Sequence, residues 1–457
     1  MRFKKSYDSK LKQYVKENHL TYCIDTMGCQ MNENDSLKYR GILEDIGFTR
    51  ATPETANVIL FNTCCVRENA ENTLFGRLGY LKSRKQKEKD VYLVVVGCMS
   101  QQKHILDKIK KSYSFTDIVL GTHSMDRFPE KLYQVICEKK KAFEYVEDRN
   151  EMIEEVPIIY EDKFKASVSI VYGCNNFCSY CIVPYVRGRE RSRAPEDIIR
   201  DVQVLADKGY KEIMLLGQNV NSYGNTFDKP YHFYDLLKEL EKIEGIEVIR
   251  FMSPHPKDFK DELIEVIQHS KKIARQVHLP LQAGSTRILK EMNRKYTKEQ
   301  YIALAEKIKK ADPAISLSTD IIVGFPGETE QDFQETLEVV RRVDYDQIYM
   351  FIYSPREGTR AAKMEDPTPH EEKVQRLERL KQVYEEKLPA LNEKMVGKTY
   401  RMLIEGKSKN NDCLYTGRTS QNKVVVLEAT EADVGQMREV TITSQHLWYL
   451  KGKLAEK

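Results

Sequence analysis

Apolar and polar positions alternate with different periods in three successive parts of the chain. In the first part, short strand-like apolar runs are separated by stretches whose apolar residues recur at helical spacing. The expected strands cover 21–26, 57–62, 91–96 and 117–121, and an expected helix covers 35–46. Strands and helices that alternate in this way are typical of a doubly wound parallel sheet, so residues 21–145 are predicted to form an α/β domain. Residues 1–20 are interpreted as a variable tail.

The second part, residues 160–390, repeats a strand and then a helix. The expected strands cover 167–172, 212–216, 248–252, 276–281, 316–323 and 347–353. A helix is expected at 195–207, where Pro195 suits the first turn, and a long charged helix near 371–388. Six such units predict a partial or complete TIM-like β/α barrel, whose chemistry takes place at the carboxyl ends of the strands. The acidic residues from about 142 to 165 are interpreted as a linker.

The third part, residues 394–457, changes character. Short β-like runs at 399–404, 423–427 and 439–443 are separated by Gly, Asn and Asp. This pattern predicts a small antiparallel β-barrel. Small barrels of this kind often bind nucleic acid, and Tyr415 and Trp448 are either base-stacking residues or core residues.

Composition restricts the class of protein. The chain has 457 residues, of which 41% are apolar and 31% charged, as in a soluble globular protein with cores large enough to dispense with disulfides. Its apolar runs are too short to span a bilayer, and its polar, lysine-rich start is unlike a secretory signal. We therefore expect a cytoplasmic protein without a membrane partner. Its ten cysteines are then thiols and metal ligands.

A basic run follows the first barrel strand. The net charge is only +4, but residues 187–193 read RGRERSR, with four arginines in seven positions. Guanidinium groups bind phosphates bidentately, so contact with nucleic acid is one interpretation. A solvated loop, or a brace for the carboxylate of a bound ligand, is the other.

Three cysteines lie just before that run. Cys174, Cys178 and Cys181 have the spacing CxxxCxxC. Three thiolates leave one iron of a [4Fe–4S] cluster without a protein ligand, and an open position is typical of a catalytic metal site. The spacing resembles the signature of radical S-adenosylmethionine (SAM) enzymes, which also have an aromatic residue at the position of Tyr180. A zinc site and three unrelated thiols are the alternatives.

Three more cysteines occupy equivalent places in the first part. Cys29, Cys64 and Cys98 each follow or end one of its expected strands. Because the carboxyl ends of parallel strands meet at one edge of the sheet, these thiols are predicted to hold a second cluster. Cys65 is left out of this set, since adjacent residues at a strand end point in opposite directions. The other cysteines, Cys23, Cys137 and Cys413, are interpreted as ordinary thiols.

From about residue 20 onward the chain resembles the tRNA and ribosomal-protein methylthiotransferases. The motifs PYVRGRERSR at 184–193, HLPLQAGS at 278–285 and DIIVGFPGET at 320–329 carry the resemblance together with the cysteines. The blocks MGCQMN at 27–32 and NTCCVRENA at 62–70 resemble the MiaB-type branch, which acts on N6-isopentenyladenosine at position 37 of tRNA.

This resemblance implies an N-terminal methylthiotransferase domain (21–145), a radical SAM core (160–390) and a TRAM domain (394–457). It implies two [4Fe–4S] clusters, one that generates a 5′-deoxyadenosyl radical from SAM and an auxiliary one that delivers sulfur. A second SAM is the methyl donor. Expected partners are the modified tRNA, a flavodoxin- or ferredoxin-like electron donor and a sulfur or cluster donor system.

The resemblance and the strand ends also suggest binding residues. Those expected at SAM are Tyr180, Gly217, Gln218, Ser253, Gln282 and Asp320. Those expected at tRNA are Gln30, Asn32, Arg187 and Arg189.

Three alternatives remain open. A relative acting on threonylcarbamoyladenosine or on a ribosomal protein would differ in the 27–32 block. A non-catalytic iron–sulfur protein, either an electron carrier or a tRNA-binding scaffold, would not cleave SAM. A zinc-dependent nucleic-acid binder would hold zinc and lack the absorbance of an iron–sulfur cluster.

Overall fold

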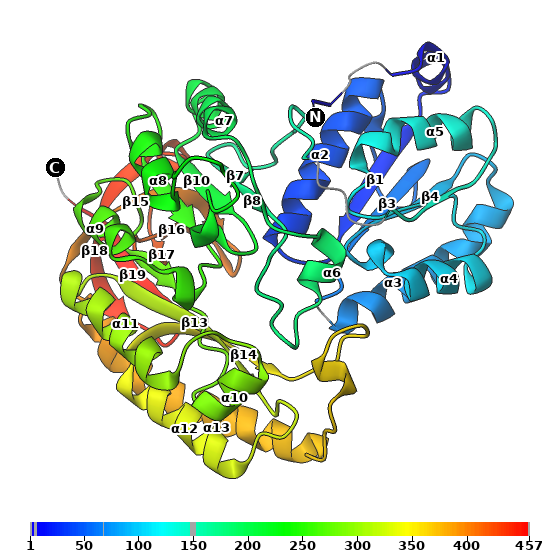
Figure 1. Cartoon of the computed structure of the whole chain (residues 1–457). Coiled ribbons are helices and arrows are strands. Elements are labelled where there is room, and N and C mark those ends of the chain that lie inside the picture. Colours follow the sequence, from blue (N-terminus) through cyan, green and yellow to red (C-terminus); the bar gives the residue numbers. More distant parts are fainter. Residues whose placement is uncertain (1, 4–6, 67, 147–151, 456–457) are drawn as a thin grey trace.

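The computed structural model describes residues 2–3, 7–66, 68–146 and 152–455. Arg67 of the 62–70 motif and residues 147–151 of the expected linker lie outside these ranges. An N-terminal domain lies beside the central barrel, and the short helix α6 (Val183–Arg187) lies between them (Figure 1). Among the described residues, no helix has both the length and the apolar character needed to cross a membrane.

The N-terminal domain contains a six-stranded sheet in the order β2-β1-β3-β4-β5-β6. Its strands are β1 (Thr21–Thr26), β2 (Thr49–Arg50), β3 (Val58–Thr63), β4 (Tyr92–Gly97), β5 (Ile118–Leu120) and β6 (Ala142–Glu144). Every neighbouring pair is parallel. Helices α1 (Ser9–Glu17), α2 (Gln30–Ile46) and α5 (Phe128–Ile136) cover one face, and α3 (Glu68–Lys87) and α4 (Lys103–Ser112) cover the other. The prediction of a doubly wound α/β domain is confirmed.

The strand order reverses between β1 and β3, and this is where open α/β sheets form a ligand crevice. The chain leaves β1 through α2, pairs β2 on one side of β1, and then returns to pair β3 on the other side. Helix α2 starts five residues before its predicted start at residue 35. It ends at Gly47, whose φ of +119° suits a glycine at a helix C-terminus.

Part of the expected N-terminal tail packs into this domain. Asp8 caps α1 by accepting a hydrogen bond from the amide of Lys10 at 2.8 Å. Leu11 and Val15 on this helix are buried in the same apolar cluster as α2 and α5. The segment therefore contributes to the core of the N-terminal domain.

The central barrel is an open one of six parallel strands. Its two three-stranded sheets contain β7 (Lys165–Ser169), β10 (Glu212–Leu216), β11 (Val248–Phe251), β12 (Gln276–His278), β13 (Ser316–Val323) and β14 (Tyr345–Ile352). A bridge between Ile249 and Ile273 joins them. The outer helices include α7 (Pro195–Asp207), α8 (Phe233–Glu241), α9 (Asp261–His269), α10 (Thr286–Glu291), α11 (Lys298–Ala311), α12 (Glu330–Arg342) and α13 (His370–Glu393). Strand β12 is shorter than predicted because Pro280 has no amide hydrogen for the ladder.

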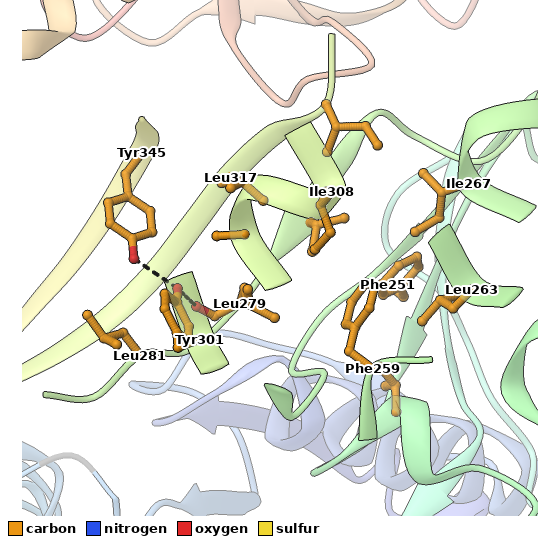
Figure 2. Close-up of a cluster of buried hydrophobic side chains, with 14 of the residues drawn as sticks. Phe251, Phe259, Leu263, Ile267, Leu279, Leu281, Tyr301, Ile308, Leu317 and Tyr345 are labelled. Carbon is orange, nitrogen blue, oxygen red and sulfur yellow. Dashed lines mark hydrogen bonds between the residues drawn. The ribbon is translucent and has the colours of Figure 1, made fainter. Parts of the chain in front are cut away.

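Apolar residues between these strands and helices form the main core (Figure 2). Leu317 of β13 and Leu279 after β12 face Ile308 of α11, and all three are fully buried. The buried hydroxyl of Tyr301 donates a hydrogen bond to the carbonyl of Leu279 at 2.7 Å and accepts one from the hydroxyl of Tyr345 at 2.9 Å. Each such large side chain contributes about 1.5–3 kcal/mol when fully buried.

The C-terminal part is a closed five-stranded barrel, in the order β15-β16-β17-β19-β18. Its strands are β15 (Thr399–Ser408), β16 (Asn411–Arg418), β17 (Val424–Leu427), β18 (Met437–Gln445) and β19 (Leu450–Leu454). The predicted small barrel is confirmed, although the pair β17–β19 is parallel. Tyr415 is buried, as the core interpretation expected, and Trp448 is exposed.

A loop of this small barrel, residues 419–423, docks on the central barrel. Arg250 of β11 donates to the carbonyl of Thr419 at 3.0 Å. Ser316, the first residue of β13, donates to the carbonyl of Gln421 at 2.8 Å. The loop thus contacts the amino-terminal half of the barrel strands, away from the cysteine loop at their carboxyl ends.

Candidate functional site

Cys174, Cys178 and Cys181, here called the barrel triplet, lie on the loop between β8 (Val171–Tyr172) and α6. Gly173 has a φ of +76°, and a Cβ there would come within 2.1 Å of the carbonyl oxygen of Arg189. Only glycine allows this approach, which is fixed by a hydrogen bond from the Cys174 amide to the carbonyl of Gly188 at 3.2 Å. The loop is therefore held in place by its own backbone.

The three thiols of the barrel triplet share one electrostatic environment. Burial raises the pKa of Cys181 to about 12, and the neighbouring Cys178 adds to the shift. Burial likewise raises the pKa of Cys174 to about 11. Arg294 is buried and donates to the Sγ of Cys178 at 3.4 Å. With raised pKa values, the thiols of Cys174 and Cys181 stay protonated until a positive centre binds, which is how a metal site couples to deprotonation.

Cys29, Cys64 and Cys98, here called the auxiliary triplet, gather at the switch point of the N-terminal sheet. The Oδ1 of Asn32 lies 3.5 Å from the Sγ of Cys29 and 3.8 Å from that of Cys98. A Cβ on Gly28 would lie 2.8 Å from the Cβ of Cys64. The structure thus brings the three predicted cysteines to one edge of the sheet.

Arg187, the last residue of α6, reaches into this second site from the barrel side. Its Nε donates to the Sγ of Cys98 at 3.1 Å, and its Nη2 donates to Asn32 at 3.4 Å. It also forms an ion pair with Asp35 at 2.8 Å. All four residues are buried, so the guanidinium is a fixed cation beside the thiols.

Cys65, which the sequence analysis left out of the auxiliary set, lies next to Cys98 in the same neighbourhood. A hydrogen bond from Cys65 and the charge of Arg187 lower the pKa of Cys98 to about 7, against the effect of burial. Strand β3 ends at Thr63, so the alternation of side chains within a strand does not extend to residues 64 and 65.

The two triplets are close neighbours in space. Helix α6 begins two residues after Cys181, and its five residues up to Arg187 rise only about 7 Å. Ile182 and Val186 pack against Cys65 and Cys98 in a small apolar cluster. One short helix therefore connects a cysteine of the first site to the second site (Figure 1).

The donor set of each triplet fits a [4Fe–4S] cluster, since three thiolates can bind three irons and leave the fourth open. In the described part of the chain, no group of three or more His, Cys, Asp or Glu side chains is arranged around one metal ion. A four-iron cluster binds each thiolate to a different iron and so spaces its ligands more widely. The structure describes all ten cysteines, and none of them forms a disulfide.

The residues expected at SAM line the carboxyl ends of the barrel strands. The Oε1 of Gln218 accepts a hydrogen bond from the amide of Gly173 at 2.5 Å, which places it at the cysteine loop. Gly217 precedes it and lies against Val171. Tyr180, on the cysteine loop itself, is partly buried against the main core.

The other three lie further along the rim. Ser253 and Gln282 both adopt positive φ values, +63° and +73°. The backbone amide of Gln282 donates a hydrogen bond to the backbone carbonyl of Asp320 at 2.8 Å. The carboxylate of Asp320 accepts from His278 at 3.3 Å inside the barrel.

Two of the residues expected to contact tRNA lie in the protein interior. Asn32 is fully buried and donates to Asn62 at 3.1 Å and to the carbonyl of Thr63 at 2.8 Å. Arg187 is equally enclosed, as described above. Neither side chain reaches the surface, so the structure places them as supports of the auxiliary triplet.

Arginines of the basic run at 187–193 also make contacts within the protein. Arg193 is buried and pairs with Glu154 at 2.6 Å and Asp201 at 2.8 Å. Arg189 is exposed, and its guanidinium lies 4.4 Å from the ring centroid of Phe177. Of the four arginines, Arg189 is the one classed as exposed.

Gln30, the first residue of α2, is exposed and lines a cavity of about 650 Å³. Met214 and Met252 contribute from the central barrel and Arg418 from the C-terminal barrel. All three domains therefore meet at this cavity.

Comparison with known proteins shows which family the chain belongs to. Residues 168–340 match the Radical SAM superfamily, 21–121 the Uncharacterized protein family UPF0004, and 393–455 the TRAM domain. The tRNA-2-methylthio-N(6)-dimethylallyladenosine synthase of Lachnoclostridium phytofermentans is 49% identical over 437 residues, 96% of this chain and 96% of that protein. The synthase of Acetivibrio thermocellus is 48% identical over 95% of this chain and 90% of that protein. The chain belongs to the tRNA-2-methylthio-N(6)-dimethylallyladenosine synthase family.

A solved structure shares the fold of this synthase-family chain. TsrM from Kitasatospora setae, a radical SAM methyltransferase with cobalamin and a [4Fe-4S] cluster bound, gives a TM-score of 0.54. It is 14% identical, and the match covers 75% of this chain and 77% of that chain. The resemblance to the methylthiotransferases is thus confirmed by the relatives, and the fold by this neighbour.

Sequence reasoning missed several residues of this synthase-family site. Arg294 follows α10 in a charged stretch, where no spacing distinguishes it from its neighbours. Near it, burial and the positive charges of Arg294 and Lys257 lower the pKa of His255 to about 2, so its imidazole is neutral. Burial raises the pKa of Glu190, whose amide bonds to Asn175 of the cysteine loop at 3.2 Å.

Proposed function

We propose that this chain adds a methylthio group to C2 of N6-isopentenyladenosine at position 37 of tRNA. The barrel triplet would hold one [4Fe–4S] cluster and the auxiliary triplet a second. When bound, the first cluster and SAM supply a radical that removes the C2 hydrogen, and the second cluster supplies sulfur that another SAM methylates. The C2–H bond of adenine has no useful acidity, so acid–base residues alone cannot activate it.

One observation carries the proposal. Helix α6 begins at the barrel triplet and ends with Arg187, whose Nε lies 3.1 Å from the Sγ of Cys98 in the auxiliary triplet. Two cysteine groups this close suit a reaction in which one group activates a carbon atom and the other delivers an atom to it. An electron carrier or a scaffold has no need for two open sites facing one substrate.

The surrounding side chains have separate tasks in this scheme. Arg294 and Arg187 each place a buried guanidinium against a thiol, and such a cation stabilises the thiolate form that a cluster requires. Ile182 and Val186 pack apolar groups against Cys98 and so exclude water from that side of the auxiliary triplet.

The rim residues are proposed as the SAM contacts. Gln218 lies against the cysteine loop and presents an amide there, and Asp320 presents a carboxylate inside the barrel. An amide and a carboxylate suit the hydroxyl and amine groups of SAM. Tyr180, Gly217, Ser253 and Gln282 complete the proposed set.

Gln30 and Arg189 are proposed as contacts of the tRNA. Gln30 is exposed and directly follows Cys29 of the auxiliary triplet. Arg189 is exposed and stacked on Phe177 of the cysteine loop, where it presents a cation to a phosphate or a base.

The proposal includes partners and a compartment. A flavodoxin- or ferredoxin-like protein would supply the electron, and a sulfur or cluster donor system would restore the auxiliary site. Because the substrate is tRNA, the reaction is placed in the cytoplasm.

The test uses the anaerobically reconstituted protein with SAM, a reductant and isopentenylated tRNA. Mass spectrometry of the digested nucleosides should find 2-methylthio-N6-isopentenyladenosine. The variant Cys178→Ala should form neither this nucleoside nor 5′-deoxyadenosine. Cys413→Ala, which removes an exposed thiol of the C-terminal barrel, is the matched control and should retain both products.

Each part of the proposal has its own contradicting result. If 5′-deoxyadenosine forms but the methylthiolated nucleoside does not, the substrate is wrong. Threonylcarbamoyladenosine tRNA and the ribosomal protein are then tested in its place. If protein that carries its clusters forms neither product, the enzyme proposal is wrong.

A further inference from the structure

We infer that Phe177 and Tyr185 form a platform on which an unpaired base of the RNA stacks, next to the nucleoside that is modified. This inference rests on the proposed function, because it presupposes that the substrate is tRNA. It adds a contact with a neighbouring nucleotide, and it assigns a role to two aromatic residues that the proposed reaction does not use.

The two rings lie on either side of Cys178 and Cys181 in the sequence and meet in space. Phe177 directly precedes Cys178, and Tyr185 is the third residue of α6. Their ring centroids are 5.7 Å apart and their planes are at 89°, which is the edge-to-face arrangement that aromatic pairs prefer. The aromatic pair therefore lies directly at the cysteine loop.

Tyr185 is exposed, although the helix that carries it is well packed. Pro184, Val186 and Arg187 of α6 are buried, whereas 52% of Tyr185 is exposed. A single exposed apolar residue is ordinary, but an aromatic pair with an exposed ring beside the candidate site has the character of a binding surface. Helix α6 thus presents this ring to a partner.

The backbone holds Phe177 in a conformation that a phenylalanine rarely adopts. Its φ of +48° is in the left-handed region. The Nδ2 of Asn293 donates to the carbonyl of Phe177 at 2.9 Å and to that of Asn176 at 3.3 Å, which keeps the loop in this shape. The ring is therefore positioned before a ligand binds, and a preorganised group loses less entropy on binding.

Cations lie beside the aromatic pair. The guanidinium carbon of Arg189 is 4.4 Å from the ring centroid of Phe177. The exposed Lys295 donates to the Oδ1 of Asn293 at 2.7 Å, the residue that holds the Phe177 carbonyl. Rings interleaved with cations are typical of single-stranded RNA sites, because the rings stack on bases and the cations neutralise phosphates. An acidic electron-donor protein would use the cations alone, so RNA is the partner that this surface favours.

The experiment measures stacking on the full-length protein after anaerobic reconstitution. The ligand is an RNA stem-loop with N6-isopentenyladenosine at position 37, in which the fluorescent base 2-aminopurine replaces the nucleotide on either side in turn. Stacking on an aromatic ring quenches this fluorescence. Tyr185→Leu removes the ring and keeps an apolar side chain, and Tyr185→Phe keeps the ring. Tyr80→Leu, which removes an 83% exposed tyrosine of α3, is the matched control.

We expect the wild type to quench one of the two labelled positions. Tyr185→Leu should bind the RNA about tenfold more weakly and lose the quenching, whereas Tyr185→Phe and Tyr80→Leu should behave as the wild type. Iron content and circular dichroism check that each protein carries its clusters and is folded.

A folded, cluster-loaded Tyr185→Leu variant with wild-type affinity and quenching overturns the inference. If that variant also reacts slowly with a flavodoxin but normally with a chemical reductant, the rings bind the electron donor instead of RNA. If the wild type itself does not bind the isopentenylated RNA, the substrate of the proposed function is wrong, and this result is distinct from any difference among the Tyr185 variants.

Discussion

At the scale of single residues, the site is organised by buried cations as much as by cysteines. Arg187 contacts Cys98, Asn32 and Asp35 at once, and it comes from the other domain. A buried guanidinium costs desolvation energy, and it is compensated here by a carboxylate, an amide and a thiol. Within the run of arginines that resembled a phosphate-binding patch, Arg187 thus joins the two domains, whereas Arg193 pairs with Glu154 and Asp201.

Arg187→Met should destabilise the protein by about 3 kcal/mol, because it leaves Asp35 buried without its partner. Urea denaturation of the cluster-free protein under reducing conditions measures this change. Arg189→Met is the matched control two residues away, where the exposed side chain stacked on Phe177 should contribute only about 1 kcal/mol. Equal stabilities of the two variants would contradict the role given to Arg187.

Burial separates residues that the sequence could not tell apart. The CxxxCxxC spacing was enough to group the barrel triplet, and the meeting of parallel strand ends was enough to group the auxiliary triplet. Exposure is a property of the folded chain, so Asn32, Arg187 and Arg193 could not be distinguished from surface residues by their type. Cys65 was separated from Cys64 by the alternation of side chains in a strand, but β3 ends at Thr63, so this alternation does not apply to residues 64 and 65.

At the scale of elements, helix ends and strand ends fix the loops that carry the chemistry. Helix α12 begins at Thr329, whose side chain and that of Asp332 cap each other's backbone amides. Asp332 also accepts hydrogen bonds from Ser285 at 2.6 Å and from Arg287, both next to or within α10. The motifs 278–285 and 320–329 are thereby joined through one carboxylate.

Asp332→Asn should lower stability by about 2 kcal/mol at pH 7, because a capping charge and its hydrogen bonds are weakened. Burial alone would raise the pKa of Asp332, but Arg287, Ser285 and Thr329 hold it well below the usual range. A carboxyl group with a lowered pKa stabilises the fold above its unfolded pKa, and this contribution is lost as the pH falls below it. The difference between wild type and variant should therefore shrink below about pH 4. Denaturation at pH 7 and at pH 3 measures it, and a difference that does not change with pH would contradict the argument.

Elements were predicted well where one periodicity dominated. Strands β1, β10 and β13 and helix α7 were predicted at their observed bounds. Strands β16 and β19 were missed, because NDCLYTGR and LKGKL are too polar for a strand pattern and pair only in the closed barrel. Their pairing is a tertiary effect, and a single-strand pattern does not contain it.

At the scale of the whole molecule, all three domains contribute to the lining of a cavity of about 650 Å³. The C-terminal barrel is attached through the loop 419–423 at the amino-terminal half of the central strands. Arg250 is central to this attachment. It pairs with Glu212 at 3.2 Å within the central barrel and also donates to the carbonyl of Thr419 in the loop.

Arg250→Met should loosen the C-terminal barrel, since the loop loses its donor and Glu212 is left as a buried charge. Limited proteolysis should then cut the chain faster between α13 and β15. Arg401→Met is the control, because Arg401 pairs with Glu247 across the same two domains but on the surface, where a pair contributes about 0–1 kcal/mol. Equal cleavage rates for the two variants would contradict the proposed docking.

The central claim is that two adjacent cysteine sites divide one reaction between them. The most direct test is Cys29→Ala, reconstituted anaerobically and given SAM, a reductant and isopentenylated tRNA. This variant loses a thiol of the auxiliary triplet and keeps the barrel triplet intact. We predict that it still forms 5′-deoxyadenosine and forms no 2-methylthio-N6-isopentenyladenosine. If both products appear at wild-type levels, the auxiliary triplet has no part in the sulfur transfer and the two-site account is wrong.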